Sequence, residues 1–169
     1  MTICSSFSLK NFASTKEEII GGNHWVPQYL EIPISHNFEY NLRKVHDMFK
    51  QIMGSASLIG MKRVLDILNS LPFNLAKLTV DRISRQISMS YSNMPTTKTN
   101  WEFNGSTVTS ISAFLPAVGD MLGGFVAISH GNSLSISLIT DTHYIQYPDE
   151  FMSLFKNNVK RFIDGNIMG

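Results

Sequence analysis

The spacing of apolar residues changes near Gln86, and this change constrains the fold of the chain more than any other sequence feature. Between residues 38 and 85 the apolar side chains recur at steps of three and four, which is typical of amphipathic helices. After Gln86 they alternate with polar residues, which is typical of strands with one buried face. The length of 169 residues fits a single domain over residues 1–169, since domains usually take about 100–200 residues. Helices and strands are therefore expected to share one core.

Three helices are predicted before Gln86. Asn37 offers an N-cap side chain for a helix over residues 38–53. A second apolar stripe covers residues 61–71, and Pro72 ends that helix because proline cannot continue it. A shorter third helix is expected over residues 75–83.

The closing helix has the most consistent signals in the chain. Pro148 suits the first turn and Gly165 suits the stop. Acidic residues lie at its start and basic residues near its end, which complements the helix dipole. Its apolar stripe predicts a face that belongs to the core: Phe151, Leu154, Phe155, Val159 and Phe162.

Strands are predicted over residues 25–34, 86–91 and 107–115. The first of these contains Pro27 and Pro33, which lack the N–H that a sheet ladder needs. We therefore expect it at an edge of the sheet or broken near its ends.

A hairpin is predicted from residues 124–129 and 134–140, joined by a His-Gly-Asn-Ser loop at residues 130–133. The Asn104-Gly105-Ser106 tripeptide is expected to mark another turn. On the second arm of the hairpin, apolar residues alternate with serines, which predicts one buried and one polar face. The apolar residues of that arm are Leu134, Ile136 and Leu138.

Charge is sparse and unevenly distributed. Charged residues make up 16% of the chain and the formal net charge is +1. Residues 43–85 are locally basic and residues 86–155 locally acidic. Solvated helix faces explain the basic stretch, and peripheral contact with an anionic membrane surface is the alternative. The near-neutral total argues against a nucleic-acid partner. Neither a secretory signal nor an apolar run long enough to span a membrane is seen, which predicts a cytoplasmic or peripheral membrane location.

No self-contained catalytic or metal site can be assembled from the residues. Cys4 is the single cysteine, so an internal disulfide and a cysteine-rich zinc module are excluded. The five histidines show no spacing typical of a metal site, and His130 and His143 are expected at the surface or in turns. Adjacent His46 and Asp47 on a helix point apart and cannot relay a proton. We assign no catalytic residue, no metal and no cofactor.

Ser92-Asn93-Met94-Pro95, preceded by Ser88-Met89-Ser90-Tyr91, resembles the Ser-Asn-x-Pro motif of the C-terminal half of wax ester synthase/diacylglycerol acyltransferase-like proteins. The resemblance covers nearly the whole chain. Further segments follow the family order: residues 7–10, Gly22-Asn23, residues 30–34, residues 104–108, Pro116, the turn around Gly131, Asp141 and Pro148-Asp149.

This family belongs to the chloramphenicol acetyltransferase-like, CoA-dependent acyltransferase fold. The resemblance implies an α/β (α+β) fold in which helices pack on a mixed sheet, with two similar halves facing a substrate tunnel. It implies transfer of a fatty acyl group from acyl-CoA, the co-substrate, to a long-chain alcohol or a diacylglycerol, giving wax ester or triacylglycerol. The family base is a histidine in a His-His-x-x-x-Asp-Gly motif of the first half, and no histidine here has an aspartate four residues later.

The resemblance implies that three residues of this chain bind substrate: Ser92, Asn93 and Pro95. Thr96-Thr97 follow where the family often has Gly-Pro, so a tight glycine turn is not assumed. Asn93 then has two interpretations, a polar group facing a cleft or a turn residue that satisfies local backbone groups. Asp141 is expected to brace the connection to the last helix.

Two functions are consistent with these observations. The first is the C-terminal lobe of an O-acyltransferase, incomplete without the histidine-bearing N-terminal half. The second is a non-catalytic lipid-binding or regulatory protein derived from that lobe. Either one predicts lipid or acyl-CoA as a ligand. The apolar face of a lone lobe also predicts a partner, either the N-terminal lobe or a second copy of the chain.

Overall fold

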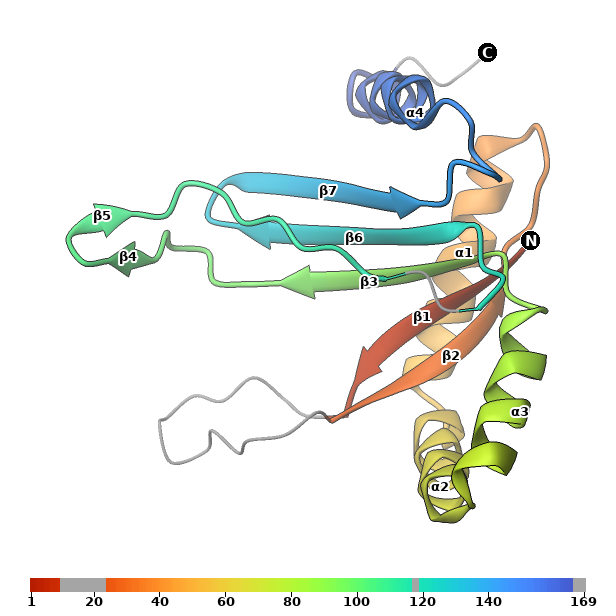
Figure 1. Ribbon diagram of the computed structural model, residues 1–169. Helices are drawn as coiled ribbons and strands as arrows, with labels where there is room; N and C mark the ends of the chain where they lie inside the picture. The colour runs from red at the N-terminus through yellow and green to blue at the C-terminus, as the bar shows by residue number, and fades with distance from the viewer. Residues whose placement is uncertain (10–23, 117–118, 166–169) are drawn as a thin grey trace.

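A computed structural model describes residues 1–9, 24–116 and 119–165, and its main feature is a five-stranded mixed sheet with helices packed against it (Figure 1). Lys10, Gly22 and Asn23, which belong to the resemblance, lie outside the described residues. The elements are β1 (Thr2–Ser8), β2 (Trp25–Glu31), α1 (Phe38–Met53), α2 (Ser57–Ser70), α3 (Phe73–Ser84), β3 (Met89–Pro95), β4 (Glu102–Phe103), β5 (Ser106–Thr107), β6 (Gly123–His130), β7 (Ser133–Thr140) and α4 (Pro148–Ile163).

The strand order is β2-β1-β3-β6-β7. The two outer pairs, β1 with β2 and β6 with β7, are antiparallel, whereas β1 with β3 and β3 with β6 are parallel. This confirms the α/β (α+β) class and the mixed sheet. It also confirms the edge position expected for the strand that contains Pro27.

The helix predictions hold where end signals are strong. Helix α1 has the predicted bounds, and the Asn37 side chain accepts a hydrogen bond of 2.9 Å from the Tyr40 N–H. Helix α4 begins with Pro148, and Gly165 follows it with φ +71°. The Asp141 carboxylate accepts a hydrogen bond from the His143 N–H at 2.8 Å and so braces the turn before α4, as expected.

Two strand predictions need correction. The strand expected over residues 86–91 begins later, at Met89, because Gln86 and Ile87 still donate to helix α3 carbonyls. The strand expected over residues 107–115 is wrong beyond Thr107, since only Ser106 and Thr107 form β5. Residues 108–116 have no regular structure, and the Val108 carbonyl is instead bonded by a side chain of β6.

The β6–β7 hairpin has the predicted position, with Gly131 at φ +56° in its turn. The Asn104–Gly105 turn is also confirmed, since both residues have positive φ between β4 and β5. The buried apolar face expected for β7 is wrong at its start, because Leu134 is 61% exposed.

Helices α1 and α4 cover one face of the sheet. Phe7 of β1 contacts Phe49 of α1, and Phe125 of β6 contacts Phe155 of α4, each pair with ring centroids 5.5 Å apart. On the opposite face, residues 108–116 pass close to β6, where a Cβ on Gly124 would lie 3.1 Å from the Leu115 carbonyl.

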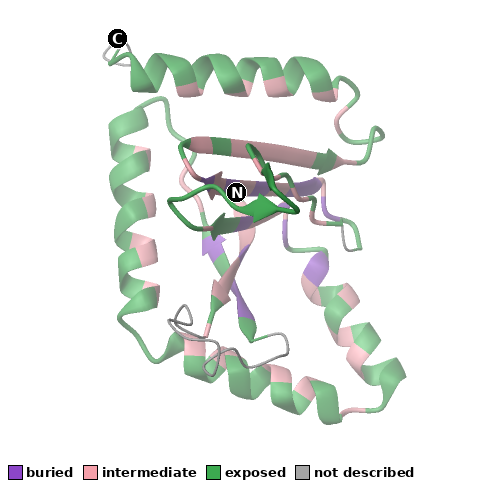
Figure 2. Cartoon of the chain, turned by 90° about the vertical axis from the view of Figure 1, so that its left-hand side faces the viewer, coloured by how far each residue is buried: buried purple, intermediate pink, exposed green. Residues whose placement is uncertain are grey.

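The core is small and lies in the sheet, while the helices are largely exposed (Figure 2). The accessible surface is 12750 Å² for a chain of 19.0 kDa, whereas folded monomers of that mass expose about 8,400 Å². Among the described residues, the buried apolar side chains are Val26, Leu30, Ile87, Met89, Met121, Val126 and Ile128. The chain thus exposes an unusually large surface for its mass.

Candidate functional site

Strand β3 divides the three predicted substrate-binding residues between the two faces of the sheet. Its partner register pairs Ser92 with Val126 and Asn93 with Ala127. Since successive strand residues point to opposite faces, Ser92 points away from Asn93 and Pro95. Ser92 is buried at 8% exposure, whereas Asn93 and Pro95 are exposed. The structure therefore brings Asn93 and Pro95 together and separates them from Ser92.

Asn93 does not lie in a turn. It is paired within a regular strand, so the turn interpretation is wrong. The interpretation of Asn93 as a polar group that faces a cleft stays a prediction.

Asn93 shares its face with aromatic side chains from neighbouring positions. Tyr91 lies two residues earlier on the same strand, and Phe125 is paired with Tyr91 on β6. Burial raises the pKa of the Tyr91 hydroxyl, so this group is a neutral hydrogen-bonding group at physiological pH. An amide beside apolar rings suits the recognition of a carbonyl or hydroxyl on an otherwise apolar ligand.

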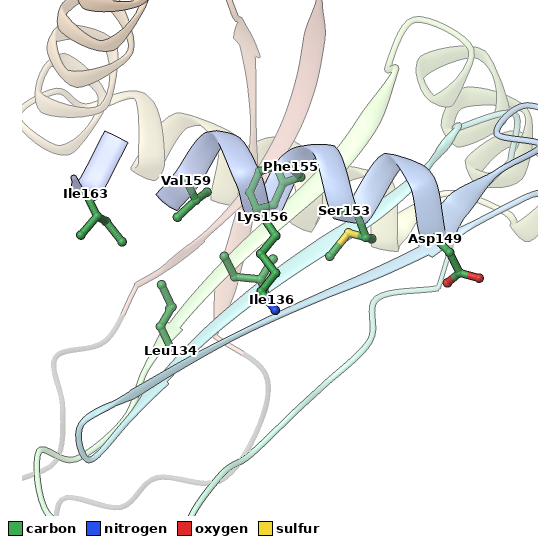
Figure 3. Close-up of a pocket in the computed structure, with 9 residues that line it drawn as sticks. Leu134, Ile136, Asp149, Ser153, Phe155, Lys156, Val159 and Ile163 are labelled. Carbon is green, nitrogen blue, oxygen red and sulfur yellow. The ribbon is translucent and has the colours of Figure 1, made fainter. Parts of the chain in front are cut away.

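A groove of about 620 Å³ lies between β7 and α4 (Figure 3). Leu134 and Ile136 form its strand side, and Lys156 reaches from α4 toward Ile136. Its remaining lining residues are Asp149, Met152, Ser153, Phe155, Val159 and Ile163. The lining is mainly apolar and has one cation near its middle, and its size matches sites for small organic ligands.

This groove was not predicted from the sequence. The apolar stripe of α4 indicated a core face, yet Leu134 opposite it is exposed and Leu154 is 58% exposed. Phe162 contacts Phe38 of α1 instead, with ring centroids 5.2 Å apart. Periodicity shows that a helix has an apolar face, but it does not show how completely one strand can cover that face.

His130 is buried at 1% exposure, so its predicted surface or turn position is wrong. It is the last residue of β6 and points toward the segment that leaves β5. The Val108 carbonyl lies 3.0 Å from Nε2, and the Thr96 hydroxyl lies 3.0 Å from Nδ1. The Thr96 hydroxyl also donates to the Ser129 carbonyl at 2.9 Å, and the Trp101 N–H lies 3.4 Å from Nε2. Both ring nitrogens are thus engaged in holding the fold.

The other histidines on helices and turns are exposed, including His46 and His143. His46 and Asp47 line a shallow hollow of about 530 Å³ on α1, together with Leu42 and Arg43. Within residues 1–9, 24–116 and 119–165, no cluster of histidine, cysteine and carboxylate side chains could hold a metal ion. In the same residues, no helix is both long and apolar enough to cross a bilayer.

Comparison with known proteins gives one match. A family model described as the WS/DGAT C-terminal domain matches residues 22–162, which is most of the chain. No curated protein and no solved structure matches the chain. The matched range includes α1 to α3, all but the last residue of α4, the sheet from β2 onward and the Ser-Asn-x-Pro segment of β3.

Proposed function

Since this chain belongs to the WS/DGAT C-terminal domain family, an acyltransferase family, we propose that it forms the C-terminal lobe of an O-acyltransferase. In this proposal the enzyme transfers a fatty acyl group from acyl-CoA to a long-chain alcohol or a diacylglycerol. The family match over residues 22–162 is the observation that carries the proposal.

The role of this chain is to bind substrate beside Asn93. The exposed amide of Asn93 stands on the face that also holds Tyr91 and Phe125. Such an amide can donate a hydrogen bond to the thioester carbonyl, whose oxygen gains negative charge in the transition state. The apolar neighbours favour an alkyl chain next to that carbonyl.

The general base is supplied by a histidine-bearing lobe outside the described residues. A neutral imidazole takes the proton of the acceptor hydroxyl as its oxygen attacks the thioester carbon. The C–S bond then breaks, and the CoA thiolate leaves with that proton. His130 does not serve as this base, because its two nitrogens bond Thr96 and Val108 in the interior.

The exposed surface supports pairing with such a lobe. The chain exposes about half as much surface again as expected for a folded monomer of its mass. The β4–β5 hairpin projects from the body (Figure 1), and its Phe103 is 78% exposed. Trp101 at the base of the hairpin is also exposed. Large exposed apolar surfaces usually mark interfaces.

An acyl-transfer assay with palmitoyl-CoA and hexadecanol tests the proposal. We expect no turnover by the chain alone and turnover when a histidine-bearing lobe of the family is co-expressed with it. In that complex, Asn93→Ala should lower kcat about tenfold or more, the cost of one hydrogen bond made in the transition state. Asn69→Ala, an exposed residue of α2, is the matched control and should have no effect. Turnover by the chain alone would contradict the proposal.

A second candidate function is lipid binding without catalysis, and one observation favours it. Helices α2 and α3 carry exposed apolar residues, including Ile67 at 62% and Leu78 at 65% exposure. Arg63 and Arg82 lie on the same two helices. Sedimentation with vesicles containing anionic lipid at low salt tests this function. Binding that is lost in Ile67→Glu and Leu78→Glu would favour it, and no binding by the unmodified chain would exclude it.

A further inference from the structure

Strand β7 is a sheet edge whose own sequence does not protect it. It is the last strand in the order β2-β1-β3-β6-β7, and it is eight residues long. Its sequence, Ser-Leu-Ser-Ile-Ser-Leu-Ile-Thr, contains no charged residue and no proline. Soluble proteins usually protect a long edge with lysine, proline or a bulge, because an open edge pairs with other strands. The sequence of β7 has none of these devices, and helix α4 lies beyond β7 but leaves a groove open between them (Figures 1 and 3).

The sequence of β7 is self-complementary. Residues 134–138 read Leu-Ser-Ile-Ser-Leu, which is a palindrome centred on Ile136. If two copies pair antiparallel about a twofold axis through Ile136, Leu134 of one copy lies opposite Leu138 of the other. The serines then oppose serines, so the apolar side chains of both copies stay on one face.

Helix α4 carries a matching seam beside this edge. Asp149, Met152, Lys156, Val159 and Ile163 are spaced three, four, three and four residues apart, and all five line the groove (Figure 3). This is the spacing of heptad a and d positions, at which helices pack along one another, and three of the five residues are apolar. The seam is open in the single chain.

The two features fit one geometry. Helix α4 packs over β6 through Phe125, and its seam faces the groove beside β7. Neighbouring strands lie about 4.8 Å apart, and a twofold axis between two β7 strands places both α4 helices on the same face of the joined sheet. The second α4 then lies on the side of the sheet where the groove of the first copy opens.

We propose that this chain forms a twofold-symmetric dimer through antiparallel pairing of β7 with β7 of a second copy, which closes the groove against the second α4. A stable interface buries about 800 Å² on each partner. The surface of 12750 Å² exceeds the amount expected for a folded monomer by several times that area. The dimer proposal is independent of the acyltransferase proposal, because it rests on the sequence and position of β7 and α4 and not on the family match.

Lys156 provides a signature of this geometry. It lies over Ile136, so a twofold axis through Ile136 brings two Lys156 ammonium groups toward each other. A lysine in a heptad seam fixes register at a cost in stability. Lys156→Leu should therefore tighten the dimer, with a fall of tenfold or more in the dimer dissociation constant.

Light scattering coupled to size exclusion tests the proposal, with sample concentrations spanning the dissociation constant. We expect the unmodified chain to be a dimer and Leu134→Lys to be a monomer, because it places a cation on the paired edge. Ile67→Lys is the matched control, since Ile67 is exposed to 62% and Leu134 to 61%. Circular dichroism should show that both variants remain folded. A monomeric unmodified chain, or a dimer that Leu134→Lys leaves intact, overturns the proposal.

Crosslinking tests the register without relying on a disruptive variant. In a Cys4→Ser background, Ile136→Cys places one thiol opposite its own symmetry mate, within reach of a disulfide. We expect rapid oxidation to a covalent dimer, whereas Ile67→Cys in the same background should oxidise slowly. Equal rates for the two cysteines would overturn the twofold axis at Ile136.

Discussion

At the scale of single residues, His130 links three segments of the chain. Its ring contacts Thr96 after β3 and Val108 after β5, and it packs edge-on against Trp101 at 5.1 Å. These three residues flank the start and end of the β4–β5 hairpin. The imidazole thus fixes the base of the hairpin to the end of β6.

Replacing His130 by alanine should lower the free energy of unfolding by about 2–4 kcal/mol. The loss combines a cavity with the loss of the hydrogen bond to the half-buried Val108 carbonyl. Urea denaturation followed by circular dichroism measures it. His143→Ala, at an exposed turn, is the control and should change stability by less than about 0.5 kcal/mol. Similar losses in both variants would contradict the structural role of His130.

Cys4 should be unreactive in the folded chain. Burial raises its pKa from 9.0 to about 11, because a thiolate is poorly solvated there. Since only the thiolate is nucleophilic, alkylation by iodoacetamide at pH 8 should be about 100-fold slower in the native chain than in urea. The native rate should rise as pH approaches 11. The folded state holds this proton more tightly, so stability should fall as pH rises from 9 through 11.

At the scale of elements, the sequence predicted correctly the helix and the hairpin whose ends are set by residues next to them in the chain. Helix α1 has its predicted bounds because Asn37 caps it, and the β6–β7 hairpin has its predicted place because Gly131 permits the turn. Residues 108–116 have the alternation of a strand, but the Val108 and Thr109 carbonyls are bonded by the side chains of His130 and Ser133, on strands distant in sequence. Sequence pattern alone does not contain such partners, so a false strand was predicted there.

The candidate site also depends on contacts between distant parts of the chain, which the sequence pattern does not show. The Ser-Asn-x-Pro motif marked a candidate segment, but whether that segment forms a turn or a strand depended on where α3 ends. Once β3 begins at Met89, strand alternation fixes which face Asn93 occupies. The groove exists because β7 covers only part of the apolar face of α4. A local sequence pattern does not predict how much of a helix face a strand will cover.

Two glycines should respond in opposite directions to alanine. A Cβ on Gly124 would lie 2.6 Å from the Ser90 hydroxyl and 3.1 Å from the Leu115 carbonyl, so Gly124→Ala should cost about 1–3 kcal/mol. Gly60 lies inside α2 with nothing within 4 Å, so Gly60→Ala should stabilise the chain by about 1 kcal/mol. Thermal melting of both variants checks the pair. Stabilisation by Gly124→Ala would show that residues 108–116 do not pack on β6.

At the scale of the whole molecule, the main feature is the ratio of exposed to buried apolar surface. Long apolar side chains are exposed on every helix, including Ile59, Leu75 and Ile163. A chain with this surface should bind the dye ANS in its native state. The fluorescence should fall when a histidine-bearing lobe associates, because the lobe covers part of that surface. Fluorescence that stays constant as the complex forms would contradict the proposed pairing of lobes.

The position of β1 in the sheet has a consequence for synthesis. Ile3 pairs in parallel with Met89, which leaves the ribosome 86 residues later. At about 5–20 residues per second, β1 waits roughly 4–17 s for that neighbour. During this interval the nascent β1–β2 hairpin is within reach of chaperones and of other nascent chains. Slow codons over α1 to α3 therefore lengthen the wait, and they should reduce the yield of soluble protein while the melting temperature of the finished molecule stays the same.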